Sequence, residues 1–462
     1  MMLLLRIICL LSWVCVQVHS KAVFAHFMVG NTGSYSKQEW RDDITLAQAA
    51  NIDAFALNMA TNELQKDSLS NAFSVAKDVN FKLFFSFDYA GNGYWPQKDV
   101  LELLTQYKDH PAYYKHNEKP FASTFEGADN ATDWRKIKNE TDCFFVPDWT
   151  SVGPRKAANH SVIDGLFSWN AWPEGPRAIN TTADKEFIAA LDGRTYMMPV
   201  SPWFYTNMPG FNKNWVWRGD NLWHDRWQQV FELEPEFVQI ISWNDYGESH
   251  YIGPLRDNGY VAFGASHGNA PFNYAQNMTH DAWRTLLPYY IDQYKSADNK
   301  TTLPIVNETA VVWYRLHPGD ACRTDGTTGN APNQGQREYP PAIILEDRIF
   351  YSALLNSSSE VKVKVGDSEA TGAWDSVPDG GKGIYHGSVP FNGTGEVRVS
   401  VMREGKAVAT IHGEPITSDC SSTQGIQNYN AWVGQSAAGH ACVEGGLVGL
   451  VAAAWIIAMQ WI

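Results

Sequence analysis

Residues 238–248, VQIISWNDYGE, decide how this chain folds: a short apolar run breaks off in tryptophan, asparagine and two acids. Seven similar runs precede it: AVFAHFMVG from Ala22, IDAFALNM from Ile52, KLFFSFDY from Lys82, FASTFEG from Phe121, CFFVPDW from Cys143, GLFSWNAW from Gly165 and TYMMPVSPWF from Thr195. Each is rich in β-branched and aromatic residues, and the intervening segments can hold a helix or a loop, which predicts parallel strands joined by crossovers. Eight such units predict an α/β fold, a (β/α)8 TIM barrel over residues 21–300, with its active site at the carboxyl ends of the strands.

Helical signals fill several of the crossovers. Ser36 and Glu39 form a capping box ahead of a helix, and apolar residues recur at helical spacing over 101–107 and 223–231. Residues 127–139 carry no such period and are expected to be a loop. Helix evidence is therefore present in most crossovers, but not in all of them.

After about residue 300 the pattern of apolar and polar residues changes. Segments such as SSSEVKVKVGD and TGEVRVSVMREGK alternate every second residue, and clusters of Gly, Asn, Ser and Pro separate them. This pattern predicts an all-β sandwich accessory domain over 301–420. Residues 421–446 are expected to be a linker.

Both ends of the chain carry targeting signals. Residues 1–20 have one early Arg and an apolar stretch, which is typical of a cleaved secretory signal peptide. The uncharged apolar tail 447–462 follows a polar spacer and small residues at 436–438, which is typical of a glycosylphosphatidylinositol (GPI) attachment signal within 421–446. A retained single helix is the alternative for the tail, but the run is short for a membrane span.

Sequons and cysteines agree with the secretory route. Nine Asn-x-Ser/Thr sequons predict a glycosylated surface; they are Asn130, Asn139, Asn159, Asn180, Asn277, Asn299, Asn307, Asn356 and Asn392. Cys143, Cys322 and Cys420 remain after processing; we expect Cys322 to pair with Cys420 and Cys143 to be a buried thiol. The net charge of −14 argues against a nucleic-acid partner.

Polar side chains gather at the predicted carboxyl ends of the strands. If the runs are strands, these groups converge on one cleft; they are Asn58, Asp88, Glu126, Asp148, Asn170, Glu174, Asp245 and Glu248. Aromatic rings and one amide lie at the same ends: Tyr89, Trp149, Trp169, Trp172, Trp203, Trp243 and Asn244. Carboxylates with aromatic rings suit a sugar-cleaving cleft, in which an acid and a base flank the glycosidic oxygen. A single acid at a strand end is more often a cap, and the rings could pack under loops; the number of acids favours the cleft.

Asp245 and Glu248 lie three residues apart, with Gly247 allowing a tight bend between them. A calcium loop needs more oxygen ligands at alternating positions than this segment offers, so we predict no metal site and no cofactor. Residues 264–268 fit G-x-S-x-G, but no helical pattern follows, so a hydrolase elbow is not expected.

The motifs as a set resemble glycoside hydrolase family 71, the fungal α-1,3-glucanases also called mutanases, over residues 22–290. The resemblance rests on VFAHFMVGN, DAFALNMA, LFFSFDYAG, FASTFEG, VPDWTS, DGLFSWNAWP and ISWNDYGESHYIGPL, in that order. It implies endo-hydrolysis of α-1,3-glucan with inversion at the anomeric carbon. By similarity, the catalytic acids fall among Asp88, Asp245 and Glu248, and Glu126 is a substrate contact or a further acid.

We therefore expect a secreted or wall-anchored monomeric glucanase. Within the catalytic set, we assign Glu248 as general acid and Asp245 as base, with Asp88 orienting the water or replacing Asp245. An inverting pair must stand roughly 6.5–9.5 Å apart to admit water. Two alternatives stay open: an endo-glycosidase on another polysaccharide, separated by product analysis, and a glucan-binding wall protein that does not cleave.

Overall fold

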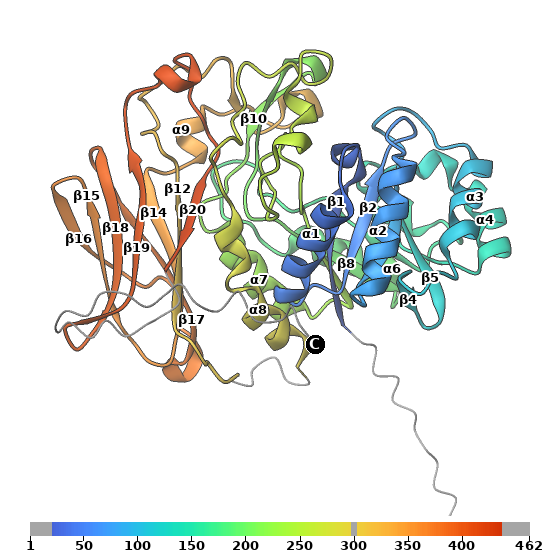
Figure 1. The fold of residues 1–462 in the computed structure, drawn as a ribbon, viewed down its shortest axis with the longest axis horizontal. Helices are drawn as coiled ribbons and strands as arrows, with labels where there is room; N and C mark the ends of the chain where they lie inside the picture. The colour runs from blue at the N-terminus through green and yellow to red at the C-terminus, as the bar shows by residue number, and fades with distance from the viewer. Residues whose placement is uncertain (1–20, 297–302, 437–462) are drawn as a thin grey trace, which may run out of the picture.

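The computed structural model describes residues 21–296 and 303–436, and a curled parallel sheet forms its centre (Figure 1). Its strands are β1 (Ala22–Met28), β2 (Ala54–Met59), β3 (Lys82–Asp88), β5 (Lys119–Phe125), β6 (Phe144–Phe145), β7 (Gly165–Phe167), β8 (Thr195–Val200) and β11 (Phe237–Ile240). The hydrogen-bonded order is β5-β3-β2-β1-β11-β8-β7, with β6 beside β5 and the short β4 (Lys115–His116) antiparallel to β5. Isolated parallel bridges join Asp148 to Phe125 and to Phe167, so the two ends of the sheet meet at Asp148.

A helix follows every parallel strand, as the alternation of the sequence predicts. The helices are α1 (Lys37–Ala49), α2 (Lys66–Asp78), α3 (Gln97–Tyr107), α4 (Asp133–Thr141), α5 (Pro154–Ala158), α6 (Thr182–Leu191), α7 (Leu222–Leu233) and α8 (Leu287–Lys295). The capping box at Ser36 and Glu39 is present at the start of α1. The mixed α/β architecture is thus confirmed.

The expected loop over 127–139 is wrong, because α4 begins at Asp133. Only Trp134, Ile137 and Thr141 face the sheet from this helix. The ring of Trp134 stacks on Phe145 of β6, with 3.6 Å between the ring centroids. One aromatic contact thus docks a helix whose other residues are mostly polar, which explains why no apolar period marks it.

Short 3₁₀ turns occupy many of the connections. They are η1 (Val29–Thr32), η2 (Ala128–Asn130), η3 (Thr150–Val152), η4 (Pro209–Phe211), η5 (Asp257–Gly259), η6 (Val261–Phe263), η7 (Asp281–Arg284), η8 (Pro332–Gln334), η9 (Asp379–Gly381) and η10 (Ser421–Thr423).

Two four-stranded antiparallel sheets make up most of the second half. One has the order β17-β14-β12-β20, with β17 (Gly383–Pro390), β14 (Arg348–Leu355), β12 (Thr309–Tyr314) and β20 (Trp432–Gln435). The other has the order β16-β15-β18-β19, with β16 (Ser368–Gly372), β15 (Glu360–Val365), β18 (Gly395–Arg403) and β19 (Lys406–Ile416). Apolar side chains of both sheets form one buried cluster.

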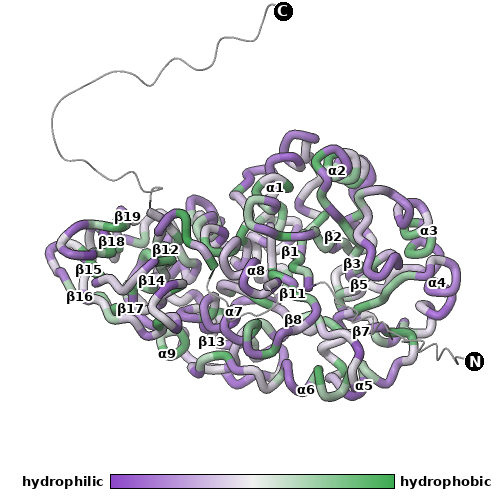
Figure 2. Tube along the Cα trace, turned by 90° about the horizontal axis from the view of Figure 1, so that it is seen from below, coloured by the Kyte–Doolittle hydropathy of each residue, from purple (hydrophilic) through white to green (hydrophobic). Residues whose placement is uncertain are grey.

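The first of these sheets is buried on both faces. In β12, Val312 and Tyr314 point into the cluster between the two sheets, whereas Val311 and Trp313 belong to the core of the parallel sheet. Helices α7 and α8 lie beside this sheet (Figure 1). In β18 apolar valines alternate with polar residues. Hydrophilic residues prevail on the outer loops (Figure 2).

The expectation of a linker over 421–446 is wrong for residues 421–436, which are packed into the second half of the structure. Strand β20 pairs antiparallel with β12, and Gln427 and Asn430 are fully enclosed. The sequence of this stretch is polar because its amides bond to buried carbonyls: Asn430 donates to Tyr274 O at 3.1 Å. Buried polar residues at a junction therefore resemble a linker when only their composition is known.

A third, small sheet links the two halves. It consists of β9 (Tyr205–Met208), β10 (Lys213–Val216) and β13 (Thr328–Gly329), and the short helix α9 (Pro341–Ile344) follows it. The first two strands form a hairpin within the connection between β8 and α7. The third comes from the second half of the chain.

Cys322 and Cys420, the pair expected from the sequence, are joined by a disulfide, and Cys143 is a buried free thiol. The expected signal peptide, the sequon Asn299, the expected GPI attachment region from residue 437 and the tail 447–462 lie outside the described residues. Within the residues described, none of the helices has the length and apolarity that a membrane span requires.

Candidate active site

Three acids reach one place at the carboxyl ends of the strands. Asp88 is the last residue of β3, and Asp245 and Glu248 lie in the loop after β11. Lys213, the first residue of β10, interacts electrostatically with all three of them. Lys213 is therefore a charged neighbour that the three proposed catalytic acids share.

Glu248 is held as a carboxylate. Lys213 Nζ donates to its Oε1 at 2.5 Å, and Nε2 of His250 lies 3.1 Å from its Oε2. Burial alone would raise the pKa of Glu248, but Lys213 and His250 outweigh burial and bring the pKa well below its usual range. The side chain keeps 12% of its surface exposed, so it is not sealed from solvent.

Asp245 lies beside Glu248 in the opposite state. Its backbone N–H donates to Ser242 Oγ at 2.9 Å, and its Oδ1 accepts the backbone N–H of Glu248 at 3.0 Å. Burial raises its pKa to about 6, and the negative charge of Glu248 acts in the same direction against His250 and Lys213. Asp245 is thus suited to carry a proton near neutral pH.

Ligand atoms of Asp245, Glu248 and His250 lie within 4.8 Å of one another. This separation corrects the expected roles, because an inverting acid and base stand roughly 6.5–9.5 Å apart. The lowered pKa of Glu248 also opposes its expected role as general acid. With the ammonium of Lys213 against Glu248, a cation at this triad would be repelled.

Asp88 completes the set from another strand. Its Oδ1 accepts the backbone N–H groups of Ala90 and Gly91 at 2.7 and 2.8 Å. Burial nevertheless raises its pKa to about 6, because Glu63 adds to the effect of burial while Lys213 opposes it. Asp88 is thus a second carboxyl whose charge changes near neutral pH.

Glu126 and Asp148 form a second acidic pair beside this group. Glu126 accepts from Ser151 N at 3.1 Å and from Ser151 Oγ at 2.5 Å, and burial raises its pKa. Asp148 is fully enclosed at the junction of β5 and β7, and burial raises its pKa well above the ordinary value. Asp148 therefore has no free surface, which corrects its proposed contact with substrate, whereas Glu126 is half-buried and remains a candidate.

The aromatic residues divide into two groups. Trp169 and Trp172 keep part of their surface exposed, as does Asn170. Trp149, Trp203 and Trp243 are at most 1% exposed, so they have no face to offer a sugar and instead support the strand ends. Trp203, for example, donates through Nε1 to Tyr429 O at 2.9 Å.

The remaining expected contacts are also structural. Asn244 accepts Met28 N through Oδ1 at 2.7 Å and ties the loop after β11 to β1. Asn58 and Tyr89 are likewise buried, and the ring of Tyr89 covers Gly127. Glu174 is exposed, and its Oε1 lies 3.5 Å from Arg337 N at the edge of the site.

Two charged or titratable neighbours were missed by sequence reasoning. His250 lies two residues after Glu248 and could have been found there. Lys213 could not have been found from the sequence, because its hairpin interrupts the alternation of strands and helices and no local motif marks it. A third residue, His26 of β1, faces Glu248, and burial lowers the pKa of His26 to about 3.

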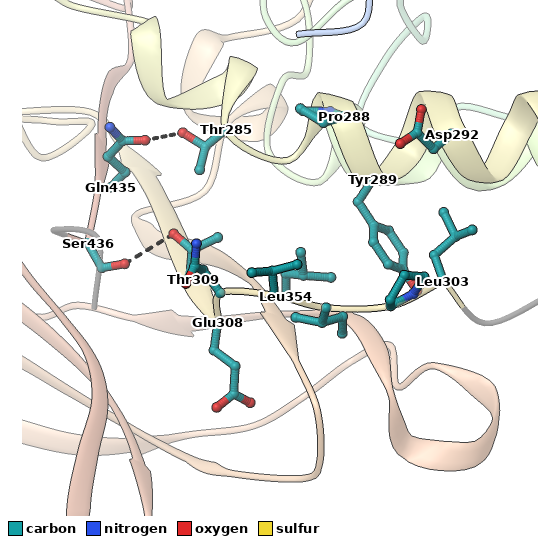
Figure 3. A pocket seen from close by; sticks show the side chains of 14 residues that line it. Thr285, Pro288, Tyr289, Asp292, Leu303, Glu308, Thr309, Leu354, Gln435 and Ser436 are labelled. Carbon is teal, nitrogen blue, oxygen red and sulfur yellow. Dashed lines mark hydrogen bonds between the residues drawn. The ribbon is translucent and has the colours of Figure 1, made fainter. Parts of the chain in front are cut away.

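A well-formed pocket elsewhere does not coincide with these groups. It lies between α8 and strands β12, β14 and β20, and has a volume of about 440 Å³ (Figure 3). Thr285 bonds to Gln435 and Thr309 bonds to Ser436 along its wall. It contains neither Lys213 nor the three acids, so we do not place chemistry there.

Comparisons with known proteins agree with this geometry. The model of glycosyl hydrolase family 71 matches residues 19–444. The chain is 37% identical to a mutanase of Penicillium rubens, over 92% of this chain and 90% of that protein. It is 34% identical to a glucan endo-1,3-alpha-glucosidase of Schizosaccharomyces pombe, over 90% of this chain and 94% of that protein.

Among solved structures, the GH99 endo-alpha-mannosidase of Bacteroides thetaiotaomicron is similar with a TM-score of 0.43 and 14% identity, over 59% of this chain and 97% of that one. This likeness is too weak to add to the assignment. The match of the family model and the two relatives are sufficient: the chain belongs to glycosyl hydrolase family 71 and is a glycoside hydrolase.

Proposed function

We propose that this glycoside hydrolase cleaves α-1,3-glucan internally, as the names of its relatives state for them. The observation that supports this most directly is the set of Asp88, Asp245 and Glu248 around Lys213. Such a set offers both a protonated and an ionised carboxyl at the mouth of the sheet, which glycoside hydrolysis needs.

The curled parallel sheet with a helix after each strand is best classed as a (β/α)8 barrel. The site then lies at the end of the barrel where such enzymes carry their chemistry. The two antiparallel sheets that follow are an accessory β-sandwich domain. We expect the enzyme to act as a monomer, which sedimentation can test.

We assign Asp245 as the general acid and Asp88 as the general base. Asp245 is protonated in part of the molecules near pH 6, which Glu248 favours by its negative charge. Asp88 comes from a different strand and activates the water that attacks the anomeric carbon. Glu248 remains ionised and stabilises the positive charge that develops on the sugar ring.

This assignment implies inversion, so the first product has the β configuration. The short separation of Asp245 and Glu248 favours one alternative, in which Glu248 is a nucleophile and the α configuration is retained. Proton NMR of the anomeric signals during the first minutes of hydrolysis separates the two. An initial β signal supports the assignment, and an initial α signal rejects it.

Substitution tests the proposed general acid and general base separately. We expect Asp88→Asn and Asp245→Asn each to lower kcat on α-1,3-glucan by on the order of a thousandfold, because each removes a proton transfer and its electrostatic support. Azide should restore turnover in Asp88→Asn with a β-azide product, because it replaces the attacking water. The matched control is Asp148→Asn, an enclosed acid after β6, which should stay within about tenfold of the wild type. Equal losses in all three variants would contradict the assignment.

We further propose that the enzyme is secreted and is held at the cell wall or surface by a GPI anchor. The described sequons Asn139, Asn159, Asn180, Asn277, Asn307, Asn356 and Asn392 are exposed, which supports glycosylation. Release from cells by a phosphatidylinositol-specific phospholipase and a mass loss on deglycosylation are the expected results. Retention in the cytosol without glycans would contradict this proposal.

A further inference from the structure

The hairpin of β9 and β10 holds Glu248 in two ways. Tyr205 N–H in β9 donates to the backbone carbonyl of Glu248 at 3.1 Å. Lys213 in β10 donates to its carboxylate at 2.5 Å. Any shift of this hairpin therefore moves both the backbone and the charge of Glu248.

The hairpin is not held by the barrel alone. Its outer strand β10 pairs with β13 of the second half, in the register Trp215 to Thr328 and Val216 to Gly329. A two-stranded hairpin is marginally stable in water, and a third strand is what usually gives such a sheet independent stability. The third strand here is supplied from more than a hundred residues later in the sequence.

Side chains reinforce this pairing next to Lys213. Asn214 donates through Nδ2 to Asp325 O at 3.0 Å, and its Oδ1 accepts the hydroxyl of Thr327 at 2.7 Å. Asn330 N–H donates to Val216 O at 3.0 Å. Thr327 is 4% exposed, so water cannot readily replace its hydrogen bond.

The supporting segment is itself anchored within the second half. Cys322, which precedes it, is bonded to Cys420. Arg323 accepts the backbone N–H of Gln427 at 2.7 Å and donates to Gly425 O at 3.0 Å. Residues 325–330 thus connect a fixed point of the second domain to the active-site hairpin.

We propose that residues 325–330 of the second domain are a positioning element that holds Lys213 among Asp88, Asp245 and Glu248, which makes this domain a component of the active site. The proposal rests on the function proposed above. It goes further because it assigns the accessory domain a role in catalysis: this domain positions Lys213.

The charge of Lys213 gives the proposal a specific signature. Glu63 and Asp148 are the charged or titratable groups near Asp88, and Tyr274 is near Asp245. His26 and His250 are near Glu248. Lys213 is the cation that acts on all three acids, and it lowers the pKa of each. Removing it should move both limbs of the pH profile of kcat/KM to higher pH, since both Asp88 and Asp245 would then hold their protons more tightly.

The experiment compares full-length variants on soluble α-1,3-glucan oligosaccharides across pH. Lys213→Met should move the profile up by about one pH unit, and Lys213→Arg should stay close to the wild type. Thr327→Val should also move the pH profile to higher pH, but by less than Lys213→Met does. In this variant the backbone amides of residues 205–216 should exchange hydrogen faster than in the wild type. Thr327→Ser, which keeps the hydroxyl, should show the pH profile and the hydrogen-exchange rates of the wild type.

The matched control is Thr410→Val in β19, which loses a hydroxyl contact to Ser400 far from the hairpin and should change neither measurement. An unshifted profile in Lys213→Met, or wild-type exchange in Thr327→Val, would overturn the proposal. Failure of the proposed function is recognised separately, as full activity in Asp88→Asn and Asp245→Asn.

Discussion

Neighbours set Glu248 apart from the two aspartates: its pKa is lowered, whereas the pKa values of Asp88 and Asp245 are both raised to about 6. Glu248 has an ammonium and an imidazole within 3.1 Å, whereas Asp245 has the charge of Glu248 beside it. Asp88 has two backbone donors but is buried. The environment therefore keeps Glu248 ionised, whereas Asp88 and Asp245 are distinguished by their positions at the ends of different strands.

The pH dependence of catalysis follows from these states. Asp88 as base must be ionised, so kcat/KM should rise as pH rises through about 6, where its pKa lies because of burial. Asp245 as acid must be protonated, so kcat/KM should fall as pH rises through its pKa of about 6. We expect a narrow bell with its optimum near pH 6, measured on soluble oligosaccharides. A plateau that extends to pH 8 would contradict this pair of roles.

The same burial predicts a cost in stability. Asp88 has a folded pKa of about 6 against an ordinary value of 3.8, so its ionised form is disfavoured in the folded state. The cost is absent below pH 4, grows between pH 4 and 6 and is constant above. The free energy of unfolding of Asp88→Asn should therefore exceed that of the wild type by on the order of 2–3 kcal/mol at pH 7.5. At pH 3.5 the two should be equal. Urea titrations at both pH values measure this; a variant that is equally stable or less stable at pH 7.5 would refute it.

That Asp88, Asp245 and Glu248 meet at one site could be predicted from the sequence, but that Lys213 joins them could not. Asp88, Asp245 and Glu248 each follow an apolar run, and parallel strands bring such ends together. Lys213 follows no such run, because it reaches the site through a hairpin inserted between β8 and α7. Burial, which removes Trp149 and Trp243 from the list of sugar contacts, depends on packing that a strand pattern does not encode.

At the scale of single elements, the turn after β5 depends on one glycine. Gly127 has a φ of 92°, and a Cβ there would lie 2.5 Å from Cγ of Tyr89. Because Tyr89 directly follows Asp88, Gly127→Ala should lower both stability and kcat. We expect a loss of about 1–2 kcal/mol from the backbone and a further 1–3 kcal/mol from overpacking.

Gly335 provides the matched control for this change. It has a similar left-handed conformation, with φ 81°, but no atom lies within 4 Å of the position of an added Cβ. Gly335→Ala should lose only the stability that the left-handed backbone conformation costs a residue with a Cβ, and its kcat should be unchanged. Equal melting temperatures and equal kcat values for the two variants would contradict the contact with Tyr89.

The helices illustrate what a periodic pattern can predict. Helix α1 was foreseen because a capping box marks its start and Trp40, Ile44 and Ala47 share its buried face. Helix α4 was missed because only a few side chains of its nine residues are buried. Its place in the fold is set by the stacking of Trp134 on Phe145, a long-range contact that has no counterpart in local sequence.

At the scale of the molecule, the two halves share one core. The sequence of β12, TAVVWY, does not alternate because both faces of the strand are buried, each against a different core. Trp313 crosses the junction and donates through Nε1 to Asp220 O at 2.7 Å. The second half is therefore integral to the fold, in keeping with its proposed role at the hairpin.

A pair of histidines at this junction makes stability sensitive to acid. His224 of α7 and His386 of β17 stack with 4.4 Å between their ring centroids, and both are buried. Burial lowers the pKa of His224 to about 4 and that of His386 well below its ordinary value of 6.5. Both are neutral in the folded protein at pH 5, whereas the unfolded chain binds protons there.

The contribution of these histidines to the free energy of unfolding should therefore be largest above pH 6.5 and should fall as pH decreases toward 4, opposite in sign to the contribution of Asp88. Each histidine contributes about 1.4 kcal/mol per pH unit within that window. His26 and His280, which are also buried, add to the slope elsewhere in the barrel. His386→Asn should reduce the slope measured by urea titration between pH 6.5 and 4.5, whereas His412→Asn, on the exposed side of β19, should leave it unchanged. An identical slope in both variants would mean that the junction does not keep His386 neutral, and that the two halves separate before the core unfolds.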